Sequence, residues 1–362
     1  MENGKWKMDN KHRLKLSVFI CVYLWLISSV FAQQNGKDAD WESAGKQGIG
    51  TALSENSKVW FTLQGGSLTE VFYPTADKAN VQWLQFVVVN PKTKQVERLR
   101  DLKDHTILLP TIGFDDNDTS KNRKSRFLCF GSMSFGEKFS WHILQTIIAD
   151  PESNTIQLQV IFNPNKQDLN LYVYYNPSLN NSGLNDTAWT EGKALLSQDG
   201  DISSALLANK PLTEISSGFY GVNDGFEELQ KDGKISSPNA KAENGNVAQL
   251  AKVSLDAIKP FSTVTFALSF GKTTTEALQT AQTSLKKGFK KMGSQYQKGW
   301  ADFVKQLPLV DKKYQAQFDY AAMTLRAMED KTFRGGNVAS LSKPWIPKGD
   351  ANGPYVSGYH LV

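Results

Sequence analysis

The feature that most constrains the fold is a long succession of short apolar runs, from about Gly48 to Gly271. The runs are rich in Val, Ile, Phe, Tyr and Thr, and clusters of Gly, Asn, Asp and Pro separate them, which is typical of β-strands joined by turns. The helical patterns of about 10 to 15 residues that connect parallel strands are missing, and only residues 224–231 suggest a short helix. The pattern therefore predicts a mainly β fold with antiparallel strands.

Eight of the runs are clear enough to be assigned as strands. Turn sequences such as residues 64–67 (Gln-Gly-Gly-Ser) favour antiparallel hairpins between neighbours. Residues 155–160 alternate strictly between polar and apolar, which predicts a strand with one buried face and one face in water. Two stacked sheets would satisfy many such strands. The predicted strands are residues 58–63, 68–73, 81–89, 139–149, 155–162, 169–175, 247–255 and 261–270.

At Thr273 the period of the apolar pattern changes from two to 3.6. Residues 274–276 (Thr-Thr-Glu) form a candidate helix cap, and helical character continues intermittently to Pro308. A second helix is predicted to begin at Asp311. It carries an apolar stripe that needs a partner, because a single amphipathic helix cannot form its own core. The stripe consists of Tyr314, Phe318, Ala321, Leu325 and Met328.

The first 32 residues have the composition of an export signal. Five basic side chains precede an apolar run at residues 16–30, and residues 30–32 (Val-Phe-Ala) offer small side chains at the cleavage-site positions. The run is shorter than the roughly 20 residues that a transmembrane helix needs. We therefore expect cleavage near Ala32 and a periplasmic or secreted protein, and a retained membrane anchor is the alternative.

Charge and cysteine content argue against several function classes. Beyond Ala32 the chain carries 36 basic and 34 acidic residues, a net charge of about +2, which gives no reason to expect nucleic acid or a membrane surface as a partner. Only Cys129 remains there, so no internal disulfide can form, and its apolar neighbours predict a core position. His105, His142 and His360 lack zinc-type spacing. We expect a monomer without a cofactor, calcium being the one candidate metal.

Two stretches near opposite ends of the chain resemble the family of bacterial glucoamylases and glucodextranases, which are glycoside hydrolases. The first comprises residues 48–52 (Gly-Ile-Gly-Thr-Ala), 57–63, 66–74 and 80–86, and is similar to the start of the family's N-terminal domain. The second comprises residues 333–341 (Phe-Arg-Gly-Gly-Asn-Val-Ala-Ser-Leu), Pro344-Trp345 and 358–362 (Gly-Tyr-His-Leu-Val), and is similar to the start of the catalytic barrel.

The resemblance implies an antiparallel β-supersandwich of the glucodextranase N-domain or galactose mutarotase type. A helical linker and the first helix of an incomplete (α/α)6 barrel would follow it. The expected division is a signal peptide at residues 1–32, the supersandwich at 33–272, the linker at 273–308 and the start of the barrel at 309–362. Because the chain ends on apolar Leu361-Val362, we expect the natural product to continue.

The resemblance also implies a function. The family removes glucose from the non-reducing ends of α-glucans with inversion, using one glutamic acid as proton donor and one glutamate that activates water. An inverting pair is roughly 6.5 to 9.5 Å apart, which leaves room for that water. Both glutamates, and the Trp-x-Arg-Asp motif that grips the terminal glucose, lie beyond the Tyr-His-Leu-Val segment. We therefore expect no catalytic residue within this chain and no activity of the chain alone.

Tyr359 and His360 match family positions at the edge of the sugar pocket, where an aromatic face stacks on glucose and an imidazole hydrogen-bonds a hydroxyl. The alternative is that both merely pack in a terminal loop. Trp345 is a weaker candidate for the same role.

Two acidic features have structural interpretations. Glu70 sits in a strand in which alternate side chains should face solvent, so we expect no acid–base role. Asp115, Asp116 and Asp118 form a cluster that could attract calcium, since hard cations favour carboxylate oxygens. The cluster lacks a complete EF-hand pattern, so a solvated turn is the preferred interpretation.

Two other function classes stay open. One is a non-catalytic β-sandwich that binds polysaccharide through exposed aromatic residues such as Trp141 or Trp189, or that serves as a scaffold for a separate barrel. The other is a sugar phosphorylase of a related sandwich-plus-barrel family. Export argues against it, because phosphorolysis conserves bond energy usefully only where phosphate and metabolism meet.

Overall fold

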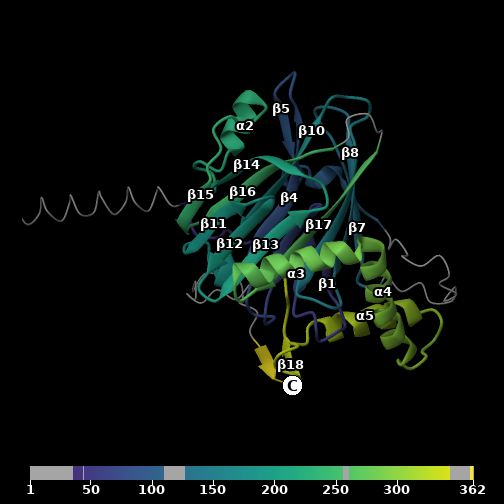
Figure 1. Ribbon diagram of the computed structural model, residues 1–362. Helices are drawn as coiled ribbons and strands as arrows, with labels where there is room; N and C mark the ends of the chain where they lie inside the picture. Colours follow the sequence, from purple (N-terminus) through teal and green to yellow (C-terminus); the bar gives the residue numbers. More distant parts are fainter. Residues whose placement is uncertain (1–35, 44, 110–126, 256–260, 343–358, 362) are drawn as a thin grey trace, which may run out of the picture.

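Two antiparallel sheets stacked face to face form the main body of the protein (Figure 1). The computed structural model describes residues 36–43, 45–109, 127–255, 261–342 and 359–361. Helix α3 runs across the strands of the second sheet, and α4, α5 and β18 lie together at one end of the sandwich (Figure 1). The mainly β, antiparallel sandwich predicted from the sequence is confirmed.

The first sheet has eight strands in the order β1-β2-β3-β4-β10-β16-β14, with β5 paired to β4 beside this path. The second sheet has nine strands in the order β15-β11-β12-β13-β17-β9-β8-β7-β6. The strands of the first sheet are β1 (Gly48–Thr51), β2 (Trp60–Gln64), β3 (Ser67–Phe72), β4 (Val81–Asn90), β5 (Gln95–Arg98), β10 (Asn170–Pro177), β14 (Leu212–Phe219) and β16 (Val247–Val253). Those of the second are β6 (Thr106–Leu109), β7 (Phe130–Phe135), β8 (His142–Ala149), β9 (Thr155–Asn163), β11 (Asp186–Glu191), β12 (Ala194–Asp199), β13 (Ile202–Ala208), β15 (Lys241–Gly245) and β17 (Ser262–Gly271).

Among the described residues, four short helices lie between strands of the sandwich, and three longer helices and two strands follow it in the sequence. The described helices are η1 (Leu99–Asp101), η2 (Lys103–His105), η3 (Leu179–Asn181), α2 (Phe226–Asp232), α3 (Thr274–Lys287), α4 (Phe289–Lys305) and α5 (Gln315–Ala327). A small two-stranded sheet of β18 (Gly336–Val338) and β19 (Tyr359–Leu361) comes last. Within the described ranges, no helix combines the length and the apolar character needed to cross a membrane.

All eight predicted strands are present, with ends that shift by a few residues. The predicted turn joins β2 and β3 as an antiparallel hairpin, and Gly65 and Gly66 both have positive φ, which glycine adopts without steric cost. The four consecutive strands β11 to β14 were not assigned individually from the sequence. Polar residues occur often in these strands, so their apolar periodicity is weak.

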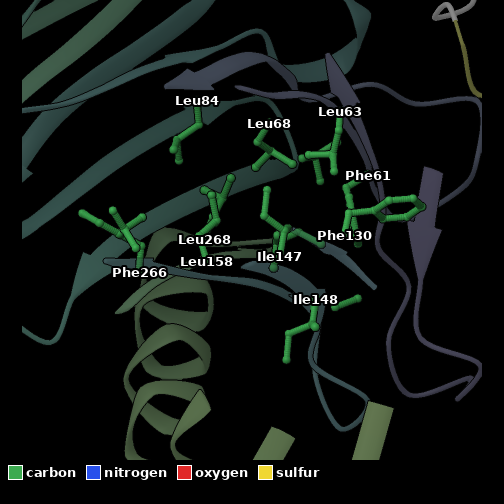
Figure 2. Packing of buried hydrophobic residues seen from close by; sticks show 14 of the residues in the cluster. Phe61, Leu63, Leu68, Leu84, Phe130, Ile147, Ile148, Leu158, Phe266 and Leu268 are labelled. Carbon is green, nitrogen blue, oxygen red and sulfur yellow. The ribbon is translucent and has the colours of Figure 1, made fainter. Parts of the chain in front are cut away.

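The main core lies between the two sheets. Figure 2 shows Phe61, Leu68 and Leu84 of the first sheet facing Leu158 and other apolar residues of the second. Each such side chain contributes about 1.5 to 3 kcal/mol when it is fully buried. The other labelled members of this core are Leu63, Phe130, Ile147, Ile148, Phe266 and Leu268.

Strand β1 packs directly against two aromatic rings of the core, and this close contact explains its glycines. A Cβ atom at Gly50 would lie 2.3 Å from the ring of Phe61, and one at Gly48 would lie 2.7 Å from the ring of Phe130. Real Cβ atoms do not approach so closely, so larger residues would displace the strand or the ring. The Gly-Ile-Gly part of the first motif therefore has a packing role.

The prediction that one face of residues 155–160 is in water was wrong. Gln157 of β9 is fully buried, and its Nε2 donates hydrogen bonds to the Ser284 carbonyl oxygen at 2.9 Å and to Ser284 Oγ at 2.7 Å. Ser284 belongs to α3, so this helix covers the polar face of the strand and accepts both hydrogen bonds from Gln157 Nε2. Gln157 Oε1 has no hydrogen-bond partner among the described residues.

Helix α3 begins at the predicted change of period, but its N-cap is Thr273, and residues 274–276, predicted as the cap, form its first turn. The Thr273 hydroxyl accepts a hydrogen bond from the Glu276 N–H, and the Glu276 carboxylate accepts one from the Lys272 N–H. The helix packs closely on the second sheet because its contact residues, Ala277 and Ala281, are small and face alanines of β13 and β17. The predicted change from strands to helices is therefore confirmed at Thr273.

Helix α4 closes one end of the sandwich with a mainly apolar face that also buries Gln297. Tyr296 and Trp300 belong to the main core. The Tyr296 hydroxyl donates to the Leu128 carbonyl oxygen at 2.7 Å, and the Trp300 Nε1–H donates to that of Thr51 at 3.0 Å. Next to this helix the core position predicted for Cys129 is confirmed, and burial raises the pKa of its thiol to about 12.

Candidate functional site

The two motifs near opposite ends of the sequence meet in space. Val338 of β18 and the following Leu341 are buried in one apolar cluster with Trp60 and Phe72 of the first sheet. We call the contact between residues 329–341 and the edge of that sheet the junction. It fixes the segment after α5 on the sandwich.

Asp330 holds the junction loop together. Its side chain is fully buried, and Oδ2 accepts a hydrogen bond of 2.7 Å from the Ala76 N–H. Oδ1 accepts hydrogen bonds of 2.7 and 2.8 Å from the N–H groups of Thr332 and Phe333. Three backbone N–H groups converge on this one carboxylate, so its role here is to position the loop.

Lys331 inserts into the sheet edge beside Asp330. Its Nζ donates hydrogen bonds to Thr51 Oγ1 at 2.6 Å and to the Ser57 carbonyl oxygen, and it lies 4.9 Å from the centre of the Trp60 ring. Burial lowers the pKa of this amine to about 7, although the carboxylate of Asp330 acts in the opposite direction. Lys331 thus titrates far from the ordinary range of a lysine.

The remaining charged groups of the junction neutralise one another. Glu329 pairs with Arg326 and, at 3.1 Å, with Arg334, which also pairs with Glu55. The cavity between these side chains and Trp300 has a volume of about 20 Å³, enough for roughly one water molecule. Ligand pockets generally measure about 300 to 1,000 Å³, so this cavity cannot hold a sugar and an attacking water between two carboxyl groups.

The predicted residues Tyr359 and His360 lie on β19. Their backbones pair with Val338 and Asn337 of β18 in the last small sheet (Figure 1). Since β18 belongs to the junction, β19 lies directly beside it. Their expected contacts with sugar stay a prediction. Trp345, the acidic cluster at Asp115, Asp116 and Asp118, and the signal segment at 1–32 lie outside the described residues. Within the described ranges, no group of three or more His, Cys, Asp or Glu side chains is arranged to hold a metal ion.

The two aromatic residues proposed for sugar stacking have different environments. Trp141 is buried, with 2% of its surface exposed, and its Nε1–H donates to Glu97 Oε2 at 2.6 Å, so the prediction that it is exposed was wrong. The carboxylate of Glu97 also accepts the N–H groups of Glu137 and Lys138, which closes the turn over the indole. Trp189 is only partly buried and lines a surface groove.

Glu70 has a structural role, but it is buried, whereas the sequence predicted a strand whose alternate side chains face solvent. It is fully buried, pairs with Lys46 at 2.5 Å and accepts a hydrogen bond of 2.7 Å from Thr62 Oγ1. The expected alternation of buried and exposed side chains fails because every residue of β3 is buried. The carboxylate ties both Glu42 and Lys46 to the sheet, since it also accepts the Glu42 N–H.

The comparisons with known proteins identify the family. The family model for glucodextranase, domain N, matches residues 32–305 of this chain. The chain belongs to the glucodextranase domain N family. The resemblance seen in the two sequence motifs is thereby confirmed.

Two glucoamylases extend the match of this glucodextranase domain N chain. A glucoamylase from Clostridium sp. (strain G0005) is 30% identical over 335 residues, which are 90% of this chain and 45% of that protein. The crystal structure of a bacterial glucoamylase complexed with acarbose matches with a TM-score of 0.74 and 28% identity, over 84% of this chain and 44% of that one. The chain therefore spans less than half the length of both relatives.

Proposed function

We propose that this chain is the N-terminal part of an exported exo-acting α-glucosidase, either a glucan 1,4-α-glucosidase or a glucodextranase, that acts on α-glucans. The division into a supersandwich at 33–272, a linker at 273–308 and the start of an (α/α)6 barrel at 309–362 belongs to the same proposal. Membership of the glucodextranase domain N family and the match to two glucoamylases support it.

The observation that carries this proposal is the orientation of α5. The residues that this helix buries are Asp319, Met323 and Ala327. Of its predicted apolar stripe, Phe318 and Met328 are partly buried, and Met328 packs on the Trp60 cluster. Tyr314, Ala321 and Leu325 are exposed, and Leu325 is 72% exposed. A large apolar face without cover is uncommon on a soluble domain and marks a surface that packs against something else. A barrel of which α5 is the first helix would provide that cover.

The catalytic step is proposed to need residues beyond Val362. Inverting hydrolysis requires one carboxylic acid that protonates the leaving oxygen and one carboxylate that activates water on the opposite face of the sugar. The acidic side chains of the junction are bound by arginines or backbone N–H groups, so they are poor candidates for either role. Tyr359 and His360 are proposed to border the sugar pocket once the barrel is complete. We therefore propose that the chain alone does not hydrolyse glucans.

The location follows from the proposed signal. Cleavage near Ala32 would release a monomeric protein into the periplasm or the medium, where α-glucans are available and a membrane or nucleic acid has no role. Edman sequencing of the product expressed in a secreting host checks the site, because an N-terminus at Gln33 is expected. A product that keeps residues 1–32 and sediments with membranes would contradict export.

The test of the activity compares the 362-residue chain with the same chain extended by the downstream coding sequence. Glucose release from maltooligosaccharides and isomaltooligosaccharides is measured, with and without inorganic phosphate. The extended chain is expected to release β-glucose without phosphate, and the shorter chain is expected to release none. Robust hydrolysis by the shorter chain would refute the proposal that the catalytic carboxyl groups lie outside these 362 residues. Phosphate-dependent release of glucose 1-phosphate would favour the phosphorylase.

A matched pair of variants tests the role of α5. In the extended protein, Leu325→Asp should lower activity and stability together, because it places a charge where the barrel is proposed to pack. In the 362-residue chain the same change should alter the unfolding free energy by less than about 0.5 kcal/mol, because the residue is exposed. Gln317→Asp, exposed on the same helix, is the control. Equal effects of both changes in the extended protein would argue against barrel packing on this stripe.

A further inference from the structure

The groove lined by Trp189 lies on the outer face of the second sheet. It has a volume of about 620 Å³ and is formed by β11, β12 and β15 with the turns beside them. These strands occupy one edge of the sheet, whereas α4 contacts β8 toward the other edge (Figure 1). The groove is therefore separate from the junction, and its volume is within the range of small-molecule sites.

The strand register places an aromatic residue beside polar groups on one face. Trp189 is opposite Leu196 of β12 and Lys241 of β15, so these three side chains form a row across the strands. Thr187 is opposite Gln198 and forms the next row on the same face. An indole thus lies next to a hydroxyl and a carboxamide, and all three line the groove.

The indole of Trp189 is held in place by apolar residues on the outer face of the sheet. It packs against the cluster of Leu196 and the small residues through which α3 contacts the sheet. Its backbone is fixed as well, since its carbonyl oxygen accepts a hydrogen bond of 3.1 Å from Gln249 Nε2. A side chain that is ordered before binding loses little conformational entropy when a ligand stacks on it. Trp189 is therefore a preorganised platform.

The charge around the groove suits a neutral ligand. Lys241 is paired with Glu243 in the same strand. Asn185, Thr187 and Gln198 offer uncharged donors and acceptors. Asp199 is the acidic residue of the lining, and a carboxylate accepts hydrogen bonds from hydroxyl groups. Nucleic acid or an anionic lipid would require a cluster of unpaired basic residues, which the lining does not provide. A neutral polymer with many hydroxyl groups and an apolar ring face fits both the indole and the amides.

We propose that this groove binds a short stretch of an α-glucan chain without cleaving it, with Trp189 as the stacking platform. The polar side chains of Asn185, Thr187 and Gln198 hydrogen-bond the hydroxyl groups at the rim. The choice of an α-linked ligand rests on the function proposed above, whereas the presence of a sugar platform rests on the groove itself. Such a site would keep the enzyme on its polymer while chain ends are consumed elsewhere.

The test uses the 362-residue chain, because binding at the groove needs no catalytic residue. Isothermal titration calorimetry is run with maltoheptaose (α-1,4), isomaltoheptaose (α-1,6) and cellohexaose (β-1,4). We expect binding of at least one α-linked oligosaccharide with a Kd on the order of 0.1 to 1 mM, typical of a shallow open groove. The two α-linked arms distinguish a starch-like from a dextran-like ligand.

Substitutions locate the binding site. Trp189→Ala should weaken binding about tenfold or more, while Trp189→Phe should retain most of it because a ring face remains. Since Trp189→Ala also removes packing under α3, Gln198→Ala and Asn185→Ala provide a second route that leaves this packing intact. Each should weaken binding roughly threefold or more. Tyr314→Ala, which removes an aromatic side chain that is 53% exposed before α5, is the matched control and should bind like the parent chain.

The outcomes separate this proposal from the proposed enzyme function. No binding of any oligosaccharide, or binding that none of the groove substitutions weakens, would overturn the groove proposal even if the extended protein hydrolyses glucans. Equal binding of cellohexaose would overturn the α-glucan class. Binding that Gln198→Ala and Trp189→Ala both weaken would support the groove, even if the extended protein proved inactive.

Discussion

The buried amine of Lys331 predicts how stability depends on pH. Its pKa is about 7 in the folded protein, against an ordinary value of 10.5 that we take for the unfolded chain. Between these two values the unfolded chain holds a proton that the folded protein has released. Raising the pH through this window therefore favours folding, with a slope of at most about 1.4 kcal/mol per pH unit. Below pH 7 and above pH 10.5 the group contributes no slope.

The size of the effect can be measured with Lys331→Met. Methionine keeps most of the apolar stem against Trp60 and cannot titrate. From pH 7.5 to 9.5 the parent chain should gain about 2 to 3 kcal/mol relative to this variant. The free energies of unfolding are obtained from urea titrations at half-unit intervals of pH. Lys290→Met, an exposed position on α4, is the control and should follow the parent chain.

A specific result would refute this account of the junction. If the parent chain and Lys331→Met gave parallel curves from pH 7 to 10, the amine would keep its proton in the folded state. The hydrogen bonds to Thr51 and Ser57 and the contact with the Trp60 ring would then outweigh the cost of burial.

Three further predictions concern packing and reactivity. Gly50→Val should destabilise the chain by about 1 to 3 kcal/mol or more, because its side chain would collide with the Phe61 ring, and thermal unfolding measures this. Ala281→Leu should cost about 1 to 3 kcal/mol by overpacking α3 on the sheet, whereas the exposed neighbour Gln282→Leu should change stability by less than about 0.5 kcal/mol in the same urea titration. Cys129 should resist a disulfide reagent at pH 8 until urea unfolds the chain, because burial holds its thiol pKa near 12, and fast labelling of the native protein would contradict this.

The parts of the fold that were predictable from the sequence depend on neighbouring residues. The cap of α3 involves only Lys272, Thr273 and Glu276, and the hairpin turn only Gly65 and Gly66, so both could be predicted locally. The strands followed from runs of residues in the same way. These signals lie within a few positions of one another, and they are independent of what packs on top.

The wrong predictions of exposed side chains share a different cause. In each case a segment that is distant in the sequence covers the side chain. The polar face of β9 is hidden by a residue 127 positions away, since Gln157 bonds to Ser284. Trp141 is satisfied by Glu97, which lies 44 positions away. No local period carries such information, so alternation predicted an exposed strand face and the aromatic type suggested an exposed indole.

The junction could be predicted only in part. The family motifs indicated that residues 333–341 matter, but Asp330 and Lys331 were not singled out. Lys331 is partly buried, and its amine is enclosed because it meets Thr51, which is 280 positions earlier in the sequence. A lysine in a polar loop offers no sequence signal of this burial. The groove was foreseen only as the suggestion that Trp189 could meet a sugar.

The separation of the junction's two halves has a consequence for biogenesis. Ala76 and Asp330, which share a hydrogen bond, are 254 residues apart. At about 5 to 20 residues per second, a ribosome needs roughly 13 to 50 s to add that length. During this interval the apolar surface around Trp60 and Phe72 has no Val338 or Leu341 to cover it. A nascent chain that folded early would expose this apolar patch, so a holding chaperone or delayed folding would protect it from aggregation.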